Sequence, residues 1–221
     1  MKVSLIIFTL NEIDGMKIIM PKIKKEWYDQ LIVVDGGSTD GTIEYVRQNG
    51  YCLLLQKKSG MGAAFCEVME EVTGDIVITF SPDGNSMPEN IPPLIEKMKE
   101  GYDIVIVSRY LDGAKSYDDT VVTAFGNWMF TKFAKLLFGA NITDLLVMFR
   151  AFKKNIPNDL EILTAGSWGT QLLLRASKRK LKIGEIPGDE PSRIGGISKM
   201  YPVKHGLLEL TMIVREFFIW R

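Results

Sequence analysis

Five short runs of β-branched and leucine residues, separated by segments with a helical pattern, constrain the fold of this chain most strongly. The runs cover residues 3–9, 31–35, 51–56, 75–80 and 103–108, and helical patterns cover residues 11–25, 40–49, 60–72 and 89–99. Runs that are apolar throughout are typical of parallel strands buried on both faces. Strands that alternate with helices indicate βαβ units. The first half therefore predicts an α/β fold whose central sheet is mainly parallel and flanked by helices, and Pro21 puts the continuity of the first helix in question.

The second half of the chain is less regular. Residues 120–138 are apolar and aromatic, residues 147–152 and 181–186 are candidate strands, and residues 166–177 and 201–220 have helical patterns. We find no internal repeat and no segment with the composition of a linker. We therefore expect a single domain over residues 1–221 that ends in an amphipathic helix at 201–221.

Composition excludes several classes of protein. Lys and Arg together number 27, as do Asp and Glu, so the chain lacks the basic excess of a nucleic-acid-binding protein. Its two cysteines and one histidine do not have the spacing of a zinc site. No window reaches the roughly 18 uncharged apolar residues of a membrane span, and the N-terminus lacks the pattern of a signal peptide. These features predict a cytoplasmic protein, either soluble or peripheral on a membrane.

Polar residues and glycines cluster where the predicted strands end. They occupy residues 9–12, 35–42, 57–62, 81–85 and 108–110. Ligands of an open parallel sheet bind beyond the carboxyl ends of its strands, so this pattern indicates a nucleotide site. Each segment has a purely structural interpretation, since Ser38 and Asp40 are also good helix N-caps. The dinucleotide-binding and P-loop glycine motifs are absent, which disfavours NAD-dependent dehydrogenases and P-loop NTPases.

Several of these segments resemble a known family. Residues 33–42, which contain Asp35-Gly36-Gly37-Ser38, resemble the signature of family 2 glycosyltransferases, which have the GT-A fold. Asn11-Glu12, residues 57–63 and Asp83 fit the same family. Later segments are similar to the dolichyl- and polyprenyl-phosphate sugar transferases. These are residues 108–110, Asp144 with residues 149–152, and residues 193–199.

The resemblance implies a division of labour along a single GT-A domain. Residues 1–110 would bind the nucleotide sugar, residues 111–200 would bind the acceptor, and 201–221 would form the C-terminal helix. The implied donor-binding residues are Thr9, Asn11, Glu12, Asp35, Gly37, Lys57, Gly62, Ser81 and Pro82. Carboxylates such as Glu12 and Asp35 suit this task because they accept hydrogen bonds from ribose hydroxyls and base N–H groups.

The resemblance also implies a divalent cation, Mg²⁺ or Mn²⁺, held by Asp83 and Asn85. Such a cation binds one or two carboxylates together with the phosphates of the substrate, and it would stabilise the charge that develops on the leaving nucleoside diphosphate. Family members usually carry Asp-x-Asp at this place, whereas this chain has Ser81-Pro82-Asp83. We therefore expect a weakened cation site, with lost activity as an alternative.

For the acceptor, the resemblance implies a lipid phosphate bound by Arg109, Arg193, Ser198 and Lys199. Arginine suits bidentate recognition of phosphate, and an ionised acceptor needs no strong base. A sugar hydroxyl would need one, and Asp144 is then the best candidate. The catalytic set is accordingly Asp83, Arg193 and Asp144. Residues 111–126 lack the additional arginines of related lipid-phosphate transferases and contain only Lys115 as a cation, which leaves the acceptor less securely assigned.

The expected activity is an inverting transfer of a sugar from a GDP-mannose or UDP-glucose type of donor to a polyprenyl or dolichyl phosphate. Transfer to a hydroxyl of a cell-surface polysaccharide or glycolipid precursor is the alternative, as is a nucleotide-binding module with weak or lost activity. The uncharged stretch at 120–131, Trp128 and Trp220 predict contact with the cytoplasmic face of a membrane. Core packing, a homo-oligomer contact or a membrane-protein partner would account for the same apolar residues.

Overall fold

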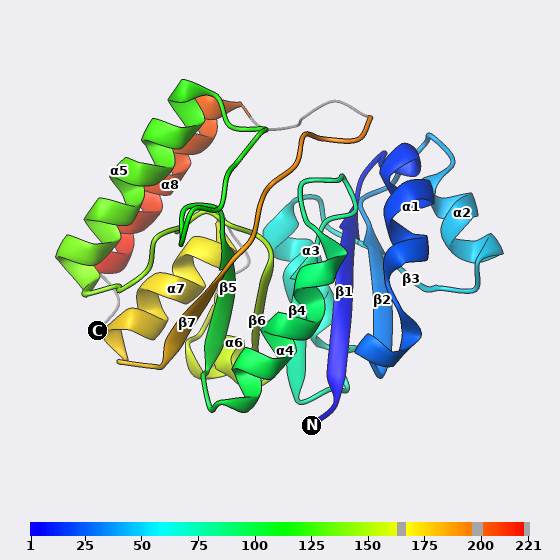
Figure 1. Cartoon of the computed structure of the whole chain (residues 1–221), viewed down its shortest axis with the longest axis horizontal. Coiled ribbons are helices and arrows are strands. Elements are labelled where there is room, and N and C mark those ends of the chain that lie inside the picture. Colours follow the sequence, from blue (N-terminus) through cyan, green and yellow to red (C-terminus); the bar gives the residue numbers. More distant parts are fainter. Residues whose placement is uncertain (163–166, 196–200, 219–221) are drawn as a thin grey trace.

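A computed structural model describes residues 1–162, 167–195 and 201–218, and one sheet runs through it. The strands are β1 (Val3–Thr9), β2 (Gln30–Asp35), β3 (Cys52–Leu55), β4 (Ile76–Phe80), β5 (Ile104–Ser108), β6 (Arg150–Lys153) and β7 (Ile183–Pro187). Their order in the sheet is β3-β2-β1-β4-β6-β5-β7 (Figure 1). All neighbours pair in parallel except β6, which is antiparallel to β4 and β5. The expected α/β fold with a mainly parallel sheet is confirmed.

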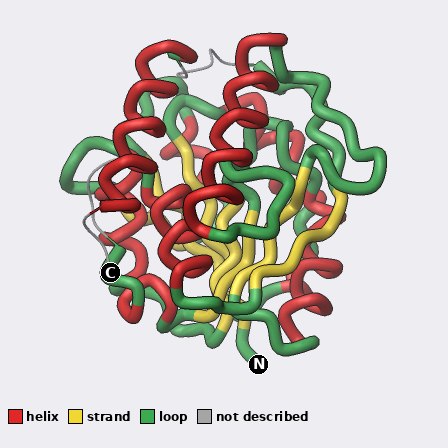
Figure 2. The backbone as a smooth tube through the Cα atoms, turned by 90° about the vertical axis from the view of Figure 1, so that its left-hand side faces the viewer, coloured by secondary structure: helices red, strands yellow, loops and turns green. Residues whose placement is uncertain are grey.

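Helices cover both faces of the sheet (Figure 2). They are α1 (Ile13–Ile19), α2 (Thr42–Gln48), α3 (Met61–Met69), α4 (Ile91–Lys99), α5 (Val121–Phe138), α6 (Ile156–Asp159), α7 (Trp168–Lys178) and α8 (Pro202–Phe218). The first predicted helix is interrupted as Pro21 suggested, because α1 ends at Ile19 and a 3₁₀ turn with Pro21 follows it. The central strands β1, β2, β4 and β5 are buried almost throughout, as the apolar runs predicted.

The strand register brings the polar segments to one edge of the sheet. Thr9, the last residue of β1, pairs with Asp35, the last residue of β2. On the other side of β1, Ile7 pairs with Phe80, the last residue of β4. Because these strands are parallel and end at nearly the same level, the loops that follow them are neighbours in space.

The helix pair α5 and α8 forms a layer beside the sheet (Figure 1). Thr120 caps α5 through its side chain, and Gly139 ends the helix in the left-handed conformation that glycine adopts without strain. Phe138 of α5 meets the ring of Phe217 of α8, with the ring centroids 6.1 Å apart. Neither helix, nor any other in the described part of the chain, combines the length and the apolar character needed to cross a membrane.

An ion pair buried between α7 and α8 fixes the C-terminal helix to the domain. Arg175 Nε lies 2.6 Å from Glu216 Oε2, and both side chains are almost wholly buried. A second bond joins Arg175 Nη2 to Glu216 Oε1 at 3.0 Å. A buried pair of this kind is strongly destabilising when one partner is removed, because the other charge stays buried.

We therefore expect Glu216→Ala to lower the free energy of unfolding by about 3–5 kcal/mol, measured by urea denaturation. Arg215→Ala is the matched control, since Arg215 is exposed on the same helix and its loss should change the free energy by roughly 0.5 kcal/mol or less. Equal effects of the two substitutions would contradict the role assigned to the buried pair.

Candidate active site

A cleft of about 670 Å³ opens at the carboxyl ends of the parallel strands. Residues from the loops after β1, β4, β5 and β7 line it, so that segments far apart in the sequence share one wall. Among the predicted site residues, those on its surface are Thr9, Glu12, Ser81, Asp83, Asn85, Arg109 and Arg193. This is the edge of the sheet at which the sequence predicted a nucleotide site.

Asp35 lies beneath the cleft, not on its surface. Its side chain is fully buried, and Oδ1 accepts hydrogen bonds from the backbone N–H groups of Gly37 and Ser38 at 2.8 and 2.7 Å. Oδ2 accepts from the hydroxyls of Thr9 at 2.9 Å and Ser38 at 2.6 Å. Both carboxylate oxygens are thus engaged within the protein. Three of these four hydrogen bonds come from Gly37 and Ser38, so Asp35 mainly holds the loop that follows β2.

The other donor residues predicted from the sequence occupy varied positions. Asn11 accepts a hydrogen bond from Thr39 N and so ties the end of β1 to the same loop. Gly37 has a φ of 93°, which only glycine adopts without strain. Lys57 is exposed on the loop before α3, and Gly62 lines an adjoining apolar cavity. None of these residues, as the structure describes them, lines the main cleft, and their roles toward a donor stay predictions.

The Asp83 loop is held from two sides by close packing. A Cβ atom at Gly15 of α1 would lie 2.1 Å from the carbonyl oxygen of Pro82, so glycine is required there. A Cβ atom at Gly84 would lie 2.6 Å from the side chain of Ile194. Ile194 N also donates to the carbonyl of Asp83 at 2.7 Å. The loop after β4 therefore packs closely against both α1 and the loop after β7.

Arg193 bridges the predicted donor-binding carboxylate of Glu12 and the predicted cation ligand Asp83. Its Nη1 lies 2.9 Å from Asp83 Oδ2, and its Nη2 donates to Glu12 Oε1. Glu12 and Asp83 are 7% and 15% exposed, and Arg193 is 18% exposed. The structure thus brings together Arg193, predicted for the acceptor, Glu12, predicted for the donor, and Asp83, predicted for the cation.

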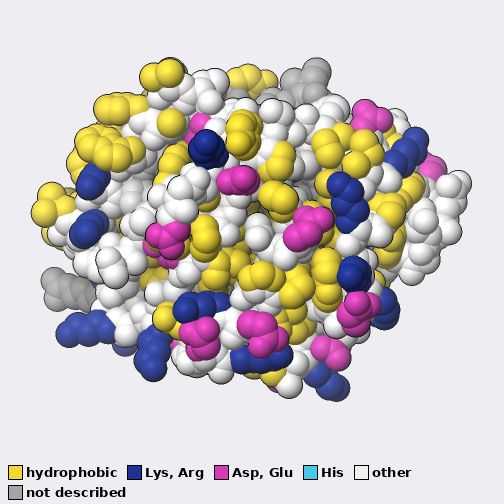
Figure 3. All heavy atoms as spheres, in the orientation of Figure 1, with side chains coloured by type: hydrophobic (Ala, Val, Ile, Leu, Met, Phe, Trp, Pro, Cys, Tyr) yellow, Lys and Arg dark blue, Asp and Glu magenta, His cyan; other side chains and the backbone are white. Residues whose placement is uncertain are grey.

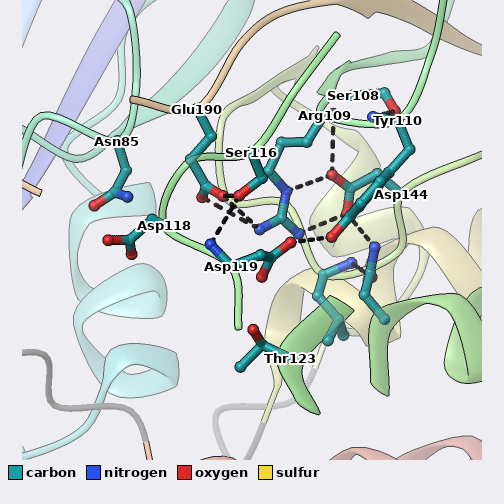
Figure 4. A network of polar contacts seen from close by, with 12 residues as sticks. Asn85, Ser108, Arg109, Tyr110, Ser116, Asp118, Asp119, Thr123, Asp144 and Glu190 are labelled. Carbon is teal, nitrogen blue, oxygen red and sulfur yellow. Dashed lines mark hydrogen bonds and ion pairs between the residues drawn. The ribbon is translucent and has the colours of Figure 1, made fainter. Parts of the chain in front are cut away.

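A second network joins Arg109, Asp144 and Glu190 (Figure 4). Asp144 is fully buried and binds Arg109 in a fork, with Nε–Oδ2 at 2.7 Å and Nη2–Oδ1 at 2.9 Å. Arg109 Nη1 reaches both carboxylate oxygens of Glu190 at 3.2 Å. Asn127 of α5 donates to Asp144 Oδ1 at 3.0 Å, and Ser116 donates to Glu190. The predicted phosphate ligand Arg109 is therefore engaged with two carboxylates.

Burial and the charged partners have opposite effects on the pKa values of Arg109 and Glu190. Burial alone would lower the pKa of Arg109, but the hydrogen bonds and charge of Asp144, with the charge of Glu190, raise it above its ordinary value. Burial raises the pKa of Glu190 and outweighs the opposing effect of Arg109. The Arg109 guanidinium therefore stays positively charged although it is buried.

Sequence reasoning missed Glu190, Asp118 and Asp119, which line the cleft, and Asn127 behind it. The overlooked signal for Glu190 is its position after the strand predicted at 181–186. That strand, β7, is parallel to β5 and ends at the same edge of the sheet. Nothing in the sequence marks Asn127, because its contact with Asp144 depends on how α5 packs. The predicted residues Ser198 and Lys199 lie outside the described residues.

The chemistry of the cleft fits one cation at Asp83. The guanidinium of Arg193 already occupies a position between Glu12 and Asp83, which shows that these oxygens stabilise positive charge. Asn85 and Ser81 line the same wall. No group of three or more acidic, cysteine or histidine side chains within residues 1–162, 167–195 and 201–218 could hold a metal ion by itself. A cation here would therefore depend on substrate phosphates for its remaining ligands, as Mg²⁺ commonly does.

Residues 4–160 match the family described as "Glycosyl transferase family 2", which covers more than half of the chain. The chain belongs to this family and is a glycosyltransferase. This confirms the family and the enzyme class that the resemblance implied.

Three named relatives are similar to this chain over most of its length. The chain is 28% identical over 205 residues to Glycosyltransferase AglJ of Haloferax volcanii, covering 90% of this chain and 66% of that protein. It is 26% identical over 214 residues to the Undecaprenyl-phosphate mannosyltransferase of Micrococcus luteus, covering 90% and 88%. It is 28% identical over 166 residues to the Dolichyl-phosphate hexose transferase of Haloferax volcanii, covering 75% and 72%.

Among solved structures, the fold is similar to that of glucosyl-3-phosphoglycerate synthase from Mycobacterium tuberculosis. Its complex with Mn²⁺, UDP and glucosyl-3-phosphoglycerate has a TM-score of 0.68 and 20% identity, covering 98% of this chain and 79% of that one. The complex of the same enzyme with Mg²⁺ and UDP has a TM-score of 0.68 and 20% identity, with the same coverage. At this identity the likeness establishes the GT-A fold.

We expect Asp35→Ala to weaken nucleotide binding by up to roughly a hundred-fold, because the loop after β2 loses the charge-assisted hydrogen bonds, worth about 1.5–3 kcal/mol, that hold it beside the cleft. Asp35→Asn is the conservative control, because its amide keeps an acceptor for the loop N–H groups and should cost less. Calorimetric titration with nucleoside diphosphates measures the effect. An unaltered dissociation constant in Asp35→Ala would show that the loop after β2 does not shape the donor pocket.

Proposed function

We propose that this glycosyltransferase transfers a sugar, with inversion, from a nucleoside-diphosphate sugar of the GDP-mannose or UDP-glucose type to the phosphate of a polyprenyl or dolichyl carrier. The observation that carries the proposal is a second cavity of about 880 Å³ beside the cleft, lined mostly by apolar side chains of α5, α7 and α8. The cavity and the cleft share wall residues, namely Gly60, Met61, Leu146, Met148 and His205. A polar cleft continuous with an apolar cavity suits an acceptor with a charged head and a hydrocarbon chain.

The named relatives support the same acceptor class. Two of them are named for undecaprenyl-phosphate and dolichyl-phosphate substrates, and the chain covers most of the length of each. Transfer to a sugar hydroxyl, the alternative, needs a general base. Asp144 was the candidate, but its carboxylate is fully buried and bound by Arg109 and Asn127. This arrangement favours an acceptor that is already ionised.

The proposed roles follow from position in the cleft. Thr9, Glu12 and Ser81 face the space where the donor would lie, and Asp83 with Asn85 would hold a Mg²⁺ or Mn²⁺ ion. When bound, that cation supplies Lewis-acid stabilisation of the leaving diphosphate. Arg193 would orient the acceptor phosphate, whose own oxygen attacks the anomeric carbon. Because that oxygen is anionic, the reaction needs no side chain to remove a proton from it.

The outer side of α5 and α8 supports peripheral binding to a membrane, on the cytoplasmic face if the donor is cytoplasmic. Apolar side chains gather over α5 in Figure 3. Exposed apolar residues of the two helices that do not line the cavity include Val121, Trp128, Leu136, Val214 and Phe218. The exposed charged residues in the described part of these helices are all basic: Lys132, Lys135, Lys204 and Arg215. An apolar face edged by basic residues is the pattern of helices that lie on anionic lipid. The partner we propose is therefore the lipid surface that carries the acceptor, and a second copy of this chain is the alternative. Trp220, which was predicted to contact the membrane, lies outside the described residues.

The acceptor is tested with radiolabelled donor supplied together with polyprenyl phosphate or with the uncharged polyprenol. We expect label in the phosphate alone. Arg193→Lys keeps the charge and loses the bidentate fork, so acceptor use should fall roughly ten- to a hundred-fold while nucleotide binding is no weaker. Equal labelling of both lipids would favour the alternative in which a hydroxyl is the acceptor. No labelling of any acceptor would favour a nucleotide-binding module without activity.

Membrane binding is tested by flotation with vesicles that contain anionic lipid. The double substitution Trp128→Glu with Leu136→Glu, at exposed residues of α5 that do not line the cavity, should weaken binding roughly tenfold or more, since each buried apolar side chain contributes about 1.5–3 kcal/mol. Ile18→Glu is the control, because Ile18 is an exposed apolar residue on α1, away from the helix pair. Similar flotation of both variants would exclude α5 as the membrane contact.

A further inference from the structure

The pairing of Arg193 with Glu12 and Asp83 bears on how the two substrates bind. Arg193 Nη1 contacts the carboxylate to which we assign the cation, at 2.9 Å, and Nη2 contacts a carboxylate on the donor side of the cleft. In this geometry Asp83 Oδ2 is occupied by the guanidinium. A divalent cation bound to this carboxylate would lie beside the guanidinium, and because the two positive charges repel each other they compete for Asp83.

The contacts of Arg193 leave room for a second arrangement. Its Nε is buried and has no hydrogen-bond partner among the described residues. The backbone beside it is fixed, since Ile194 N donates to the carbonyl of Asp83 at 2.7 Å and Ile194 packs against Gly84. A rotation of the side chain alone would therefore release both carboxylates. A phosphate offers the guanidinium oxygens for its fork, which is the pairing that arginine makes best.

We propose that Arg193 couples the two substrate sites by exchanging partners. It binds Glu12 and Asp83 until a cation and a nucleotide sugar take the donor site, and its displacement then presents it to the acceptor phosphate. The cation, which carries two positive charges, replaces the guanidinium beside Asp83, so this carboxylate is not left buried and unpaired. Glu12 is in this scheme a positioning residue that acts through Arg193. The inference rests on the proposed function for the identity of the acceptor, but not for the exchange at Asp83.

The exchange also predicts a change in cation affinity, which can be measured without enzyme turnover. An arginine that occupies Asp83 reduces the apparent affinity for the cation by the fraction of molecules in which the site is free. Removing the arginine should therefore tighten binding of Mn²⁺ alone. By reciprocity, a cation and nucleotide that displace Arg193 should tighten acceptor-phosphate binding by the same factor that the acceptor tightens theirs.

The first experiment titrates the nucleotide-free protein with Mn²⁺ and measures free Mn²⁺ by electron paramagnetic resonance. Arg193→Gln should lower the Mn²⁺ dissociation constant about three- to tenfold. Arg47→Gln, which removes an exposed arginine charge on α2, should leave it unchanged. Arg193→Lys separates displacement from long-range charge, because it keeps the charge and loses the fork. It should also bind Mn²⁺ more tightly, by about twofold or more.

The second experiment follows the Arg193 side chain directly. In ¹⁵N spectra of arginine Nε groups, the Arg193 signal is identified by its loss in Arg193→Gln. It should exchange with solvent slowly in the protein alone and rapidly once Mg²⁺ and a nucleoside diphosphate, chosen by thermal shift, are saturating. Glu12→Gln should accelerate the exchange without ligands, as the loss of a positioning contact predicts.

Wild-type Mn²⁺ affinity in Arg193→Gln, or an Arg193 signal unchanged at saturating Mg²⁺ and nucleotide, would overturn the exchange. Failure of the lipid-phosphate assay with a positive Mn²⁺ result would instead reject the acceptor and keep the displacement at Asp83. The two proposals therefore fail separately.

Discussion

The parallel pairing of β1 with β2 and β4 is the constraint on which the rest of this enzyme depends. It ends three strands at nearly one level, with Thr9 opposite Asp35 and Ile7 opposite Phe80. Chain segments that are 25 to 75 residues apart in the sequence consequently share one edge. The Asp35 carboxylate uses this proximity by binding Thr9 and the loop of its own strand. The shape of the cleft thus follows from sheet register together with one buried carboxylate.

Charge in the cleft is organised as two clusters, each with one arginine between two carboxylates. Arg109 is bound by Asp144 and Glu190, and Arg193 by Glu12 and Asp83. The two networks differ in kind. Asp144 is fully buried and the first network ties α5 to the loop after β5, whereas Arg193 lies where substrates would compete for its partners. The first network suits a scaffold, and the second suits exchange during binding.

The helix pair α5–α8 adds apolar surface beside the cleft at the sheet edge. Its inner side lines the cavity beside the cleft, and its outer side exposes aromatic and aliphatic side chains edged by lysines. The buried pair Arg175–Glu216 fixes α8 against α7, so the cavity has a firm wall. In the proposed function, this layer of two helices would serve both the chain of the lipid acceptor and the surface from which that lipid comes.

The sequence by itself determined the fold class, the strands of the first half, the helix break near Pro21 and the edge of the sheet at which polar residues meet. These follow from local patterns: apolar runs, helical periodicity, and turn residues at strand ends. Tertiary structure alone decided the antiparallel insertion of β6, the burial of Asp35 and the partners of Arg109 and Arg193. The reason is physical, since a side chain's partner depends on atoms brought from distant segments. Arg193 and Glu12 are 181 residues apart in the chain, and no local pattern encodes that they meet.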